Sequence, residues 1–504
     1  MSKYIFYDLE TSGRGKKEYP TAFGTTPKWE QIMQIAAIVT DSKFNQTNQN
    51  MNEFCRPRTS VISQPGALIT TLKGMREALD APQSSYELMK KINETFDEWK
   101  KDDPSSTFFI GHNIIEFDES VLEYNLFSHM FYPYVTRKSR GDTLNLARGL
   151  YAINPSSIKT PLTERGNPSF KLEKIAEMNN LPVEFAHDAF SDVKTSIALT
   201  KYINEADTTN WSQLQMTMSK EDAIAYINKN KGFCLMTSFG GRIKLQALSM
   251  VCESQYNGWF HTIDLAHDPT PLIEANSEEF KKLIKRKNRY VITNQHPIIL
   301  PGKIAANYEP YDEIGSDVLN ERAKIVFKNK DLADKFKLME IDRRIEKEDE
   351  KSQDNVFPES AANAFLDFKQ STEIAKFHEQ NDWNEKYKIA LSIKEPRANF
   401  ILKRLIFDES PKTLSKEDFK MVHRELHERL VINQERPFTT IPEAMSQTDT
   451  ELVKMEESDD ENKDQKMQIL KDYNVYLNFM DKYFSNKNAE PLPSGKELSK
   501  IIFG

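Results

Sequence analysis

The sequence predicts an α/β domain at the N-terminus, then a small β-rich domain, and then a helical region that runs to the end. Three observations support this order. Apolar strand patterns alternate with helical spacing over the first 200 residues. Short strands separated by glycine turns occupy residues 232–300, which suggests a small barrel. Beyond residue 353 apolar residues recur every three or four positions, and glycine is rare.

The first strand, residues 4–13 with the sequence YIFYDLETSG, carries two acids in an apolar run. On a strand residues i and i+2 share one face, so Asp8 and Glu10 project together while Leu9 turns into the core. Neighbouring acids repel each other and lose hydration, which is unfavourable unless a cation lies between them. We interpret the pair as half of a metal site; two acids at an exposed strand end are the alternative.

Residues 32–41 and 51–55 are the next predicted strands, and with the first they form a sequential meander. A helix beginning at Ser84 has apolar residues at helical spacing and is expected to cover one face of the sheet. A further strand, Phe108–Ile110, leads through a Gly-His-Asn turn into a helix that starts near Asp118. Taken alone, that position favours a capping role for Asp118. Residues 167–181 give a short helix with Lys171 near its start.

The stretch HDAFSDVKTSIALTKYI, residues 187–203, places a histidine before a helix and an acid inside it. Positions five apart on one helix differ by about 140° in direction, so His187 and Asp192 converge only if His187 precedes the helix. Asp188 is a suitable N-cap that allows this arrangement. A lone histidine is more often structural, but the three acids already placed favour a catalytic role.

Composition limits the function only loosely. The chain of 504 residues has a formal net charge of −8, three widely spaced cysteines and no apolar run of 18 residues. These features argue against a disulfide framework, a zinc CxxC site and a membrane span, and they predict a soluble cytoplasmic protein. Two basic stretches, residues 13–19 and 281–289, are either solvated surface or walls that face a phosphate backbone. The acidic run 457–464 is interpreted as a solvated insertion.

The acids and the histidine together predict metal-assisted phosphodiester hydrolysis. Carboxylate oxygens are hard ligands that suit Mg²⁺ or Mn²⁺. The negative charge of four carboxylates nearly balances the charge of two divalent ions. Two ions roughly 4 Å apart form the clamp used for in-line phosphoryl displacement. A histidine with a pKa near neutrality is suited to take the proton of the attacking water.

The motifs FYDLETSG, GHNIIEFD and HDAFSD resemble the three motifs of the DEDDh 3′ to 5′ exonucleases. The whole chain is similar to the bacterial exonuclease I family, including TTLKGMREA after a Gln-Pro-Gly-Ala turn, and SFKLE. The resemblance implies a ribonuclease-H-like exonuclease domain over residues 1–204, an SH3-like β-barrel domain over 205–352 and an all-α C-terminal domain over 353–504. These domain limits agree with a polar, turn-rich stretch at residues 204–211 and with a second predicted boundary around residues 346–360.

The same resemblance implies the individual roles. Asp8, Glu10 and Asp192 bind one Mg²⁺, Asp8 and Asp118 serve a second, Mn²⁺ substitutes for either, and His187 is the base. The residues expected to contact the substrate are Glu10, Thr11, Lys171, Tyr134 and Arg148. Lys171 stands where the family often has arginine; it keeps the charge but loses the bidentate fork.

The implied activity is processive 3′ to 5′ degradation of single-stranded DNA to 5′-mononucleotides by a monomer acting in DNA repair and recombination. The implied partner is the acidic C-terminal tail of single-strand-binding protein. Two alternatives stay open. One is an RNA 3′ to 5′ exonuclease, because the same five residues serve both substrates. The other is a catalytically silent scaffold that binds single strands by stacking and a charged groove.

Overall fold

The structure is a computed structural model of the 504-residue chain. It describes residues 2–15, 29–137, 139–183, 188–206, 208–239, 241–351, 357–359, 368–432, 434 and 436–504. His187 and most of the basic stretch 13–19 lie outside the described residues.

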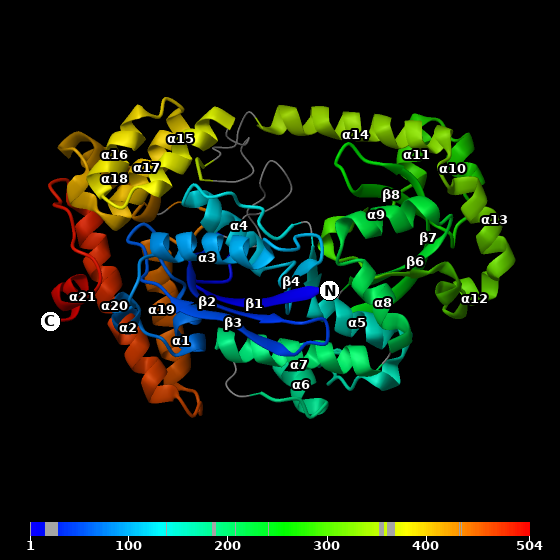
Figure 1. Cartoon of the computed structure of the whole chain (residues 1–504), viewed down its shortest axis with the longest axis horizontal. Coiled ribbons are helices and arrows are strands. Elements are labelled where there is room, and N and C mark those ends of the chain that lie inside the picture. Colours follow the sequence, from blue (N-terminus) through cyan, green and yellow to red (C-terminus); the bar gives the residue numbers. More distant parts are fainter. Residues whose placement is uncertain are drawn as a thin grey trace.

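The first sheet has five strands in the order β3-β2-β1-β4-β5 (Figure 1). Its strands are β1 (Lys3–Thr11), β2 (Ile32–Thr40), β3 (Gln46–Phe54), β4 (Thr107–Gly111) and β5 (Arg140–Asp142). The first three pair antiparallel in sequence, which confirms the predicted meander, whereas β4 and β5 continue the sheet in parallel. The strand that carries the acid pair is therefore central, with a hydrogen-bonded neighbour on each side.

Helices cover both faces of this sheet, with α3 and α4 on one side and α7 on the other (Figure 1). The helices of this part are α1 (Pro65–Thr71), α2 (Met75–Leu79), α3 (Ser85–Lys100), α4 (Asp118–Ser128), α5 (Thr143–Ile153), α6 (Leu172–Met178) and α7 (Ala189–Ala206). Ser84 caps α3 by accepting a 3.2 Å hydrogen bond from the Glu87 backbone N–H, so the helix begins where the sequence predicts.

The second sheet is antiparallel throughout, in the order β10-β6-β7-β8-β9. Its strands are β6 (Phe233–Phe239), β7 (Arg242–Glu253), β8 (Trp259–Asp264), β9 (Asn288–Ile292) and β10 (Ile299–Pro301). The helices around it are α8 (Thr208–Met216), α9 (Lys220–Lys229), α10 (Thr270–Glu274), α11 (Ser277–Leu283), α12 (Tyr311–Ile314), α13 (Ser316–Val326) and α14 (Lys330–Lys351). The basic stretch 281–289 spans the end of α11 and the start of β9.

Every regular element described from residue 368 onward is helical, as the sequence predicts. The helices are α15 (Phe368–Glu379), α16 (Trp383–Ser392), α17 (Pro396–Glu409), α18 (Lys416–Leu430), α19 (Ile441–Glu456), α20 (Lys463–Ser485) and α21 (Lys496–Phe503). The acidic run 457–464 forms the turn between α19 and α20 and enters the first turn of α20. In Figure 1 these helices lie on the side of the first sheet opposite to the second sheet, and α14 extends across the top between the two.

Both predicted boundary stretches contain helix, although residues 204–211 were expected to be rich in turns. In the first, residues 204–211, α7 continues to Ala206 and α8 begins at Thr208. In the second, residues 346–360, α14 extends to Lys351. The polar residues of α8 and α14 are compatible with helix because their apolar side chains, such as Leu214 and Phe336, are buried in a core.

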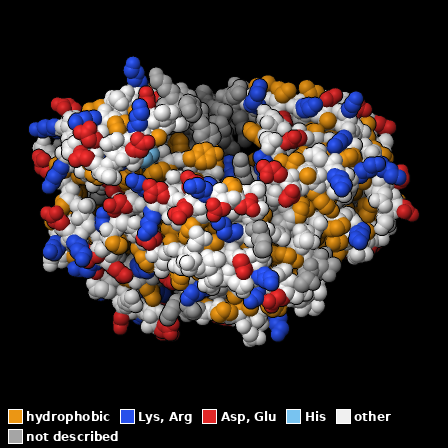
Figure 2. Space-filling view, in the orientation of Figure 1, with side chains coloured by type: hydrophobic (Ala, Val, Ile, Leu, Met, Phe, Trp, Pro, Cys, Tyr) orange, Lys and Arg blue, Asp and Glu red, His pale blue; other side chains and the backbone are white. Residues whose placement is uncertain are grey.

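Acidic and basic side chains are interspersed on the face shown in Figure 2, in keeping with the small net charge. Among the described helices none is both long and apolar enough to cross a membrane.

Candidate active site

Three carboxylates meet at the centre of the first sheet. Asp8 and Glu10 come from β1, and Asp192 comes from the first turn of α7, which packs on β1 and β2. One oxygen of each lies within 4.8 Å of the others, and all three side chains are partly buried. Leu9, between the two strand acids, is buried in the core on the opposite face. The period-two alternation of the strand thus places the acids as the sequence predicts.

Asp118 is the fourth acid, at the first position of α4. Its Oδ1 accepts a 3.1 Å hydrogen bond from the backbone N–H of Leu9, which ties α4 to the strand of the acid pair. The N-cap of α4 is Phe117 and has no side-chain capping bond, so the capping role weighed for Asp118 is wrong. The turn before α4 is held by Asp142, whose Oδ1 accepts a 2.8 Å bond from the Asn113 N–H.

The electrostatics of the cluster are unfavourable without a cation. Burial raises the pKa of Asp8 well above its ordinary range, and the carboxylates of Asp118, Glu10 and Asp192 raise it further. The pKa of Glu10 is raised to about 8, mainly by burial and next by the carboxylate of Asp192. Burial also raises the pKa of Asp118 to about 8. Such shifts are typical of acids whose negative charges are not balanced. A divalent cation among hard carboxylate oxygens would balance them, so the residues fit a divalent metal ion.

Two cavities adjoin the cluster, and both are lined in part by Glu10 and Thr11. The larger has a volume of about 1260 Å³ and extends from β1 to Gln447 and Glu451 of α19, so the C-terminal helices contribute to its wall. The smaller has a volume of about 340 Å³ and includes Lys73 in its lining. Two open spaces beside Glu10 are thus available to a substrate.

The remaining predicted residues are more dispersed. Thr11 donates a 2.6 Å bond to the Gly13 carbonyl at the rim of the larger cavity. The ring of Tyr134 lies 3.7 Å from the guanidinium of Arg137. Arg148 lies 6.0 Å from the ring of Phe170, and the exposed Lys171 is the N-cap of α6. Tyr134, Arg148 and Lys171 are not among the described residues that line the two cavities.

Sequence reasoning missed several residues that lie around the cluster. Glu119, next to Asp118, accepts hydrogen bonds from Tyr7 and Thr136 at 2.6 Å each and from Arg140 at 2.5 Å. Asp188 was expected only as a cap; its Oδ2 does accept a 3.2 Å bond from the Ser191 N–H.

Lys73 and Gln34 were not singled out at all. Lys73 donates a 2.9 Å hydrogen bond to Gln34 near the cluster. The only signal in the sequence was that Lys73 falls inside the TTLKGMREA segment.

Comparisons with known proteins show which families and folds the chain is similar to. A family model described as Exonuclease matches residues 5–200. Exodeoxyribonuclease I of Escherichia coli is 29% identical over 293 residues, which are 56% of this chain and 58% of the relative. Exodeoxyribonuclease I of Haemophilus influenzae is 30% identical over 206 residues, or 40% of each chain. The chain therefore spans less than two thirds of the length of these curated relatives.

Solved structures match over a longer region. Exonuclease I from Methylocaldum szegediense has a TM-score of 0.76 at 21% identity, covering 95% of this chain and 100% of that one. Exonuclease I of E. coli in complex with a 5cy-dT13 oligonucleotide has a TM-score of 0.72 at 21% identity, with coverage of 95% and 100%. At this identity the likeness establishes the fold, and it extends over nearly the whole chain. Residues 5–200 match the family model described as Exonuclease, and the resemblance to bacterial exonuclease I expected from the three motifs is confirmed.

Proposed function

We propose that the protein is a 3′ to 5′ exonuclease that degrades single-stranded DNA to 5′-mononucleotides. The observation that carries the proposal is the cluster of Asp8, Glu10 and Asp192, with Asp118 bonded to the same strand, in a domain of the exonuclease family. The curated relatives are named Exodeoxyribonuclease I, and two of the similar structures hold dT13 and dA16 oligonucleotides, which favours DNA as the substrate.

The metal ions proposed are two Mg²⁺, with Mn²⁺ able to substitute. Asp8, Glu10 and Asp192 would hold one ion, and Asp8 and Asp118 the other. When bound, the pair supplies positive charge at the attacking and leaving oxygens of an in-line displacement. The chain itself positions these ligands: β1 fixes Asp8 and Glu10 on one face, and the N–H of Leu9 orients the Asp118 carboxylate.

His187 is proposed as the general base that takes the proton of the attacking water. It would lie immediately before Asp188, whose carboxylate bonds to the first turn of α7. Thr11, together with Glu10, would contact the terminal nucleotide, because both line the two cavities beside the acids.

Lys171, Tyr134 and Arg148 are proposed to contact the rest of the strand. Lys171 is exposed, which leaves its ammonium accessible to a phosphate. Tyr134 and Arg148 are partly exposed, and the ring and guanidinium suit stacking and phosphate contacts respectively.

The domain organisation proposed is a ribonuclease-H-like exonuclease domain over residues 1–204, an SH3-like domain over 205–352 and an all-α domain over 353–504. The antiparallel five-stranded sheet and the seven α-helices described after residue 368 support the second and third parts.

The proposed biological setting is DNA repair and recombination by a cytoplasmic monomer. One similar structure is named as an exonuclease I complex with SSB-Ct. We therefore include the acidic C-terminal tail of single-strand-binding protein as a proposed partner.

The test follows 5′-labelled single-stranded DNA over time with Mg²⁺ and with chelator, beside RNA and duplex DNA of the same sequence. Metal-dependent shortening of the DNA strand is expected, and Asp8→Ala should abolish it while the exposed-site control Asp102→Ala retains full activity. Preferential loss of RNA would favour the RNA exonuclease, and tight binding without shortening would favour the scaffold. A fully active Asp8→Ala variant would refute catalysis at this cluster.

A further inference from the structure

A lysine ammonium lies beside the acid cluster, in the wall of the 340 Å³ cavity that Glu10 and Thr11 also line. Lys73 belongs to the short turn between α1 and α2, directly after Leu72, which ends α1 in the left-handed conformation with φ 55°. Its Nζ lies 4.1 Å from the centroid of the Phe54 ring, and the side chain is partly exposed. The turn and the ring together hold a positive charge at the edge of the cavity.

The acceptor for this ammonium is Gln34, which is the cross-strand partner of Glu10 in the β1–β2 ladder. The Gln34 amide is nearly fully buried and uses all of its groups. Its Oε1 accepts the 2.9 Å bond from Lys73, and its Nε2 donates to Asn52 at 2.9 Å and to Asp188 at 3.2 Å. A buried amide with three partners has one orientation, so it acts as a rigid bridge.

The bridge ends at the start of the helix that carries the third ligand. Asp188 receives the Gln34 bond on Oδ1 and the Ser191 N–H on Oδ2, and its carbonyl accepts a 3.0 Å bond from the Asp192 N–H. Through these contacts, the position of Lys73 is linked to the position of Asp192. The same Gln34 side chain lies opposite Glu10 on the neighbouring strand.

The charge of Lys73 opposes the charge of the cluster. Asp192, Asp118 and Asp188 raise the pKa of Glu10, whereas Lys73 lowers it. Burial lowers the pKa of Lys73, whereas Asp188 and Glu10 oppose this shift and favour its protonated form. A fixed cation near the acids weakens the attraction of the cluster for metal ions and strengthens its attraction for an anionic strand end.

We propose that Lys73 is a positioning residue of the acid cluster, which fixes the start of α7 through Gln34 and Asp188. Its positive charge also lowers the affinity of the cluster for divalent cations and raises the affinity of the site for the anionic end of the substrate. The inference rests on the proposed function, because it assigns Lys73 to the metal and substrate site of that reaction.

The decisive prediction is that one substitution moves two affinities in opposite directions. Lys73→Met removes the charge and keeps the length of the side chain. Without DNA, it should bind Mn²⁺ about three- to tenfold more tightly, since a nearby positive charge is lost. Its KM for a single-stranded oligonucleotide should rise about three- to tenfold for the same reason, with a smaller change in kcat. Lys73→Arg should stay close to the natural protein in both measurements.

A purely structural role gives a different pattern, because loosening the site weakens both affinities together. The control Lys101→Met removes an exposed lysine in the segment after α3 and should change neither value. The difference between Lys73→Met and the natural protein should shrink at high salt, as expected for a partly exposed charge.

The experiment titrates Mn²⁺ into each full-length, DNA-free protein by calorimetry and then measures kcat and KM on a labelled oligonucleotide with Mg²⁺. Unchanged or weaker Mn²⁺ binding by Lys73→Met, in a protein whose melting temperature shows it folded, overturns the proposal. If that variant does not fold, the same titration is carried out with Lys73→Gln, and the same outcome overturns the proposal. Failure of the natural protein to bind Mn²⁺ or to cleave DNA would instead count against the proposed function, so the two failures are distinguishable.

Discussion

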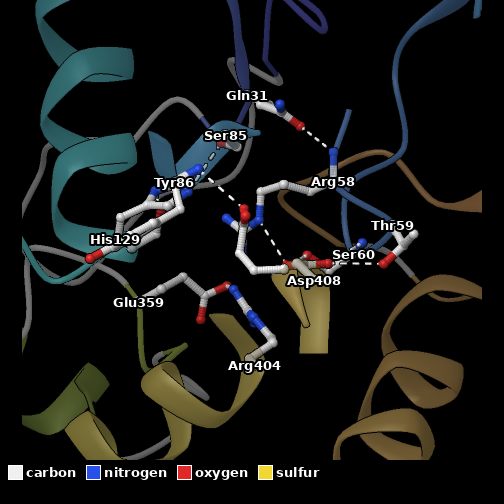
Figure 3. A network of polar contacts seen from close by, with 12 residues as sticks. Gln31, Arg58, Thr59, Ser60, Ser85, Tyr86, His129, Glu359, Arg404 and Asp408 are labelled. Atoms are coloured by element: carbon white, nitrogen blue, oxygen red, sulfur yellow. Dashed lines mark hydrogen bonds and ion pairs between the residues drawn. The ribbon is translucent and has the colours of Figure 1, made fainter. Parts of the chain in front are cut away.

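Replacing Asp408 by alanine should strongly destabilise the contact between the C-terminal helices and the segment that follows β3. Asp408 lies near the end of α17, and its carboxylate accepts four hydrogen bonds from the segment after β3 (Figure 3). Arg58 Nε donates at 2.8 Å, Thr59 Oγ1 at 3.0 Å, and Ser60 through N at 3.0 Å and Oγ at 2.6 Å.

The magnitude follows from burial. The side chains of Arg58 and Asp408 are 3% and 1% exposed, so removal of the carboxylate leaves a guanidinium without its charge partner in the interior. Breaking such a pair by deleting one member costs about 3–5 kcal/mol. Asp408→Asn keeps the shape and some acceptors but loses the charge, and its cost should be smaller, about 1–3 kcal/mol.

Urea denaturation followed by tryptophan fluorescence and by circular dichroism measures the loss. The matched control is Asp472→Ala, because Asp472 of α20 also pairs with an arginine of the first domain, Arg76. That pair is separated by 3.4 Å with side chains 20% and 53% exposed, so its loss should cost at most about 1 kcal/mol. Equal losses in the two alanine variants would refute the reasoning that burial sets the value of these contacts.

Three further predictions concern other sites. The pKa of Glu359 is held at about 2, because Arg404 and Arg429 together outweigh the opposing effect of burial. This depressed pKa stabilises the fold above about pH 4.5, and about 3 kcal/mol should be lost as the pH falls to about 2; acid unfolding of Glu359→Gln should lack this dependence. His187→Ala should lower the cleavage rate roughly 10²- to 10⁴-fold with little change in oligonucleotide binding, and an unchanged rate would reject its role as base. Arg140→Met should cost about 3–5 kcal/mol in urea unfolding, since it leaves the buried carboxylate of Glu119 without its cationic partner; a loss below about 1 kcal/mol would contradict this.

Local patterns in the sequence predicted the centre of the site because the relevant geometry is local. The alternation along β1 determines that Asp8 and Glu10 share a face, whatever else the chain does. Helical spacing after Asp188 likewise predicted that Asp192 lies inside a helix, and the structure has it in the first turn of α7. The strand and helix identities of these elements were predicted from periodicity, with limits that shift by a few residues at the ends.

The contacts that sequence reasoning missed join residues far apart in the chain. Gln34 meets Asp188 across 154 positions, and the Leu9 N–H meets Asp118 across 109. Nothing local distinguishes these partners from ordinary polar residues. β3 shows a related limit: its first residues, beginning at Gln46, are polar and largely exposed because β3 is an edge strand, so the pattern revealed only its buried end.

The two faces of β1 explain why the acid cluster depends on the whole chain. Ile5, Tyr7 and Leu9 belong to a hydrophobic core that continues into the C-terminal helices. Tyr4 and Phe6, which alternate with them, belong to a second core that continues into the second sheet and its helices. The strand that holds Asp8 and Glu10 is therefore packed on one face against the core shared with the C-terminal helices and on the other against the core shared with the second sheet. A fragment ending near residue 204 would expose apolar surface on both sides of this strand and would lose the α19 wall of the larger cavity, so the geometry of the cluster is a property of the complete fold.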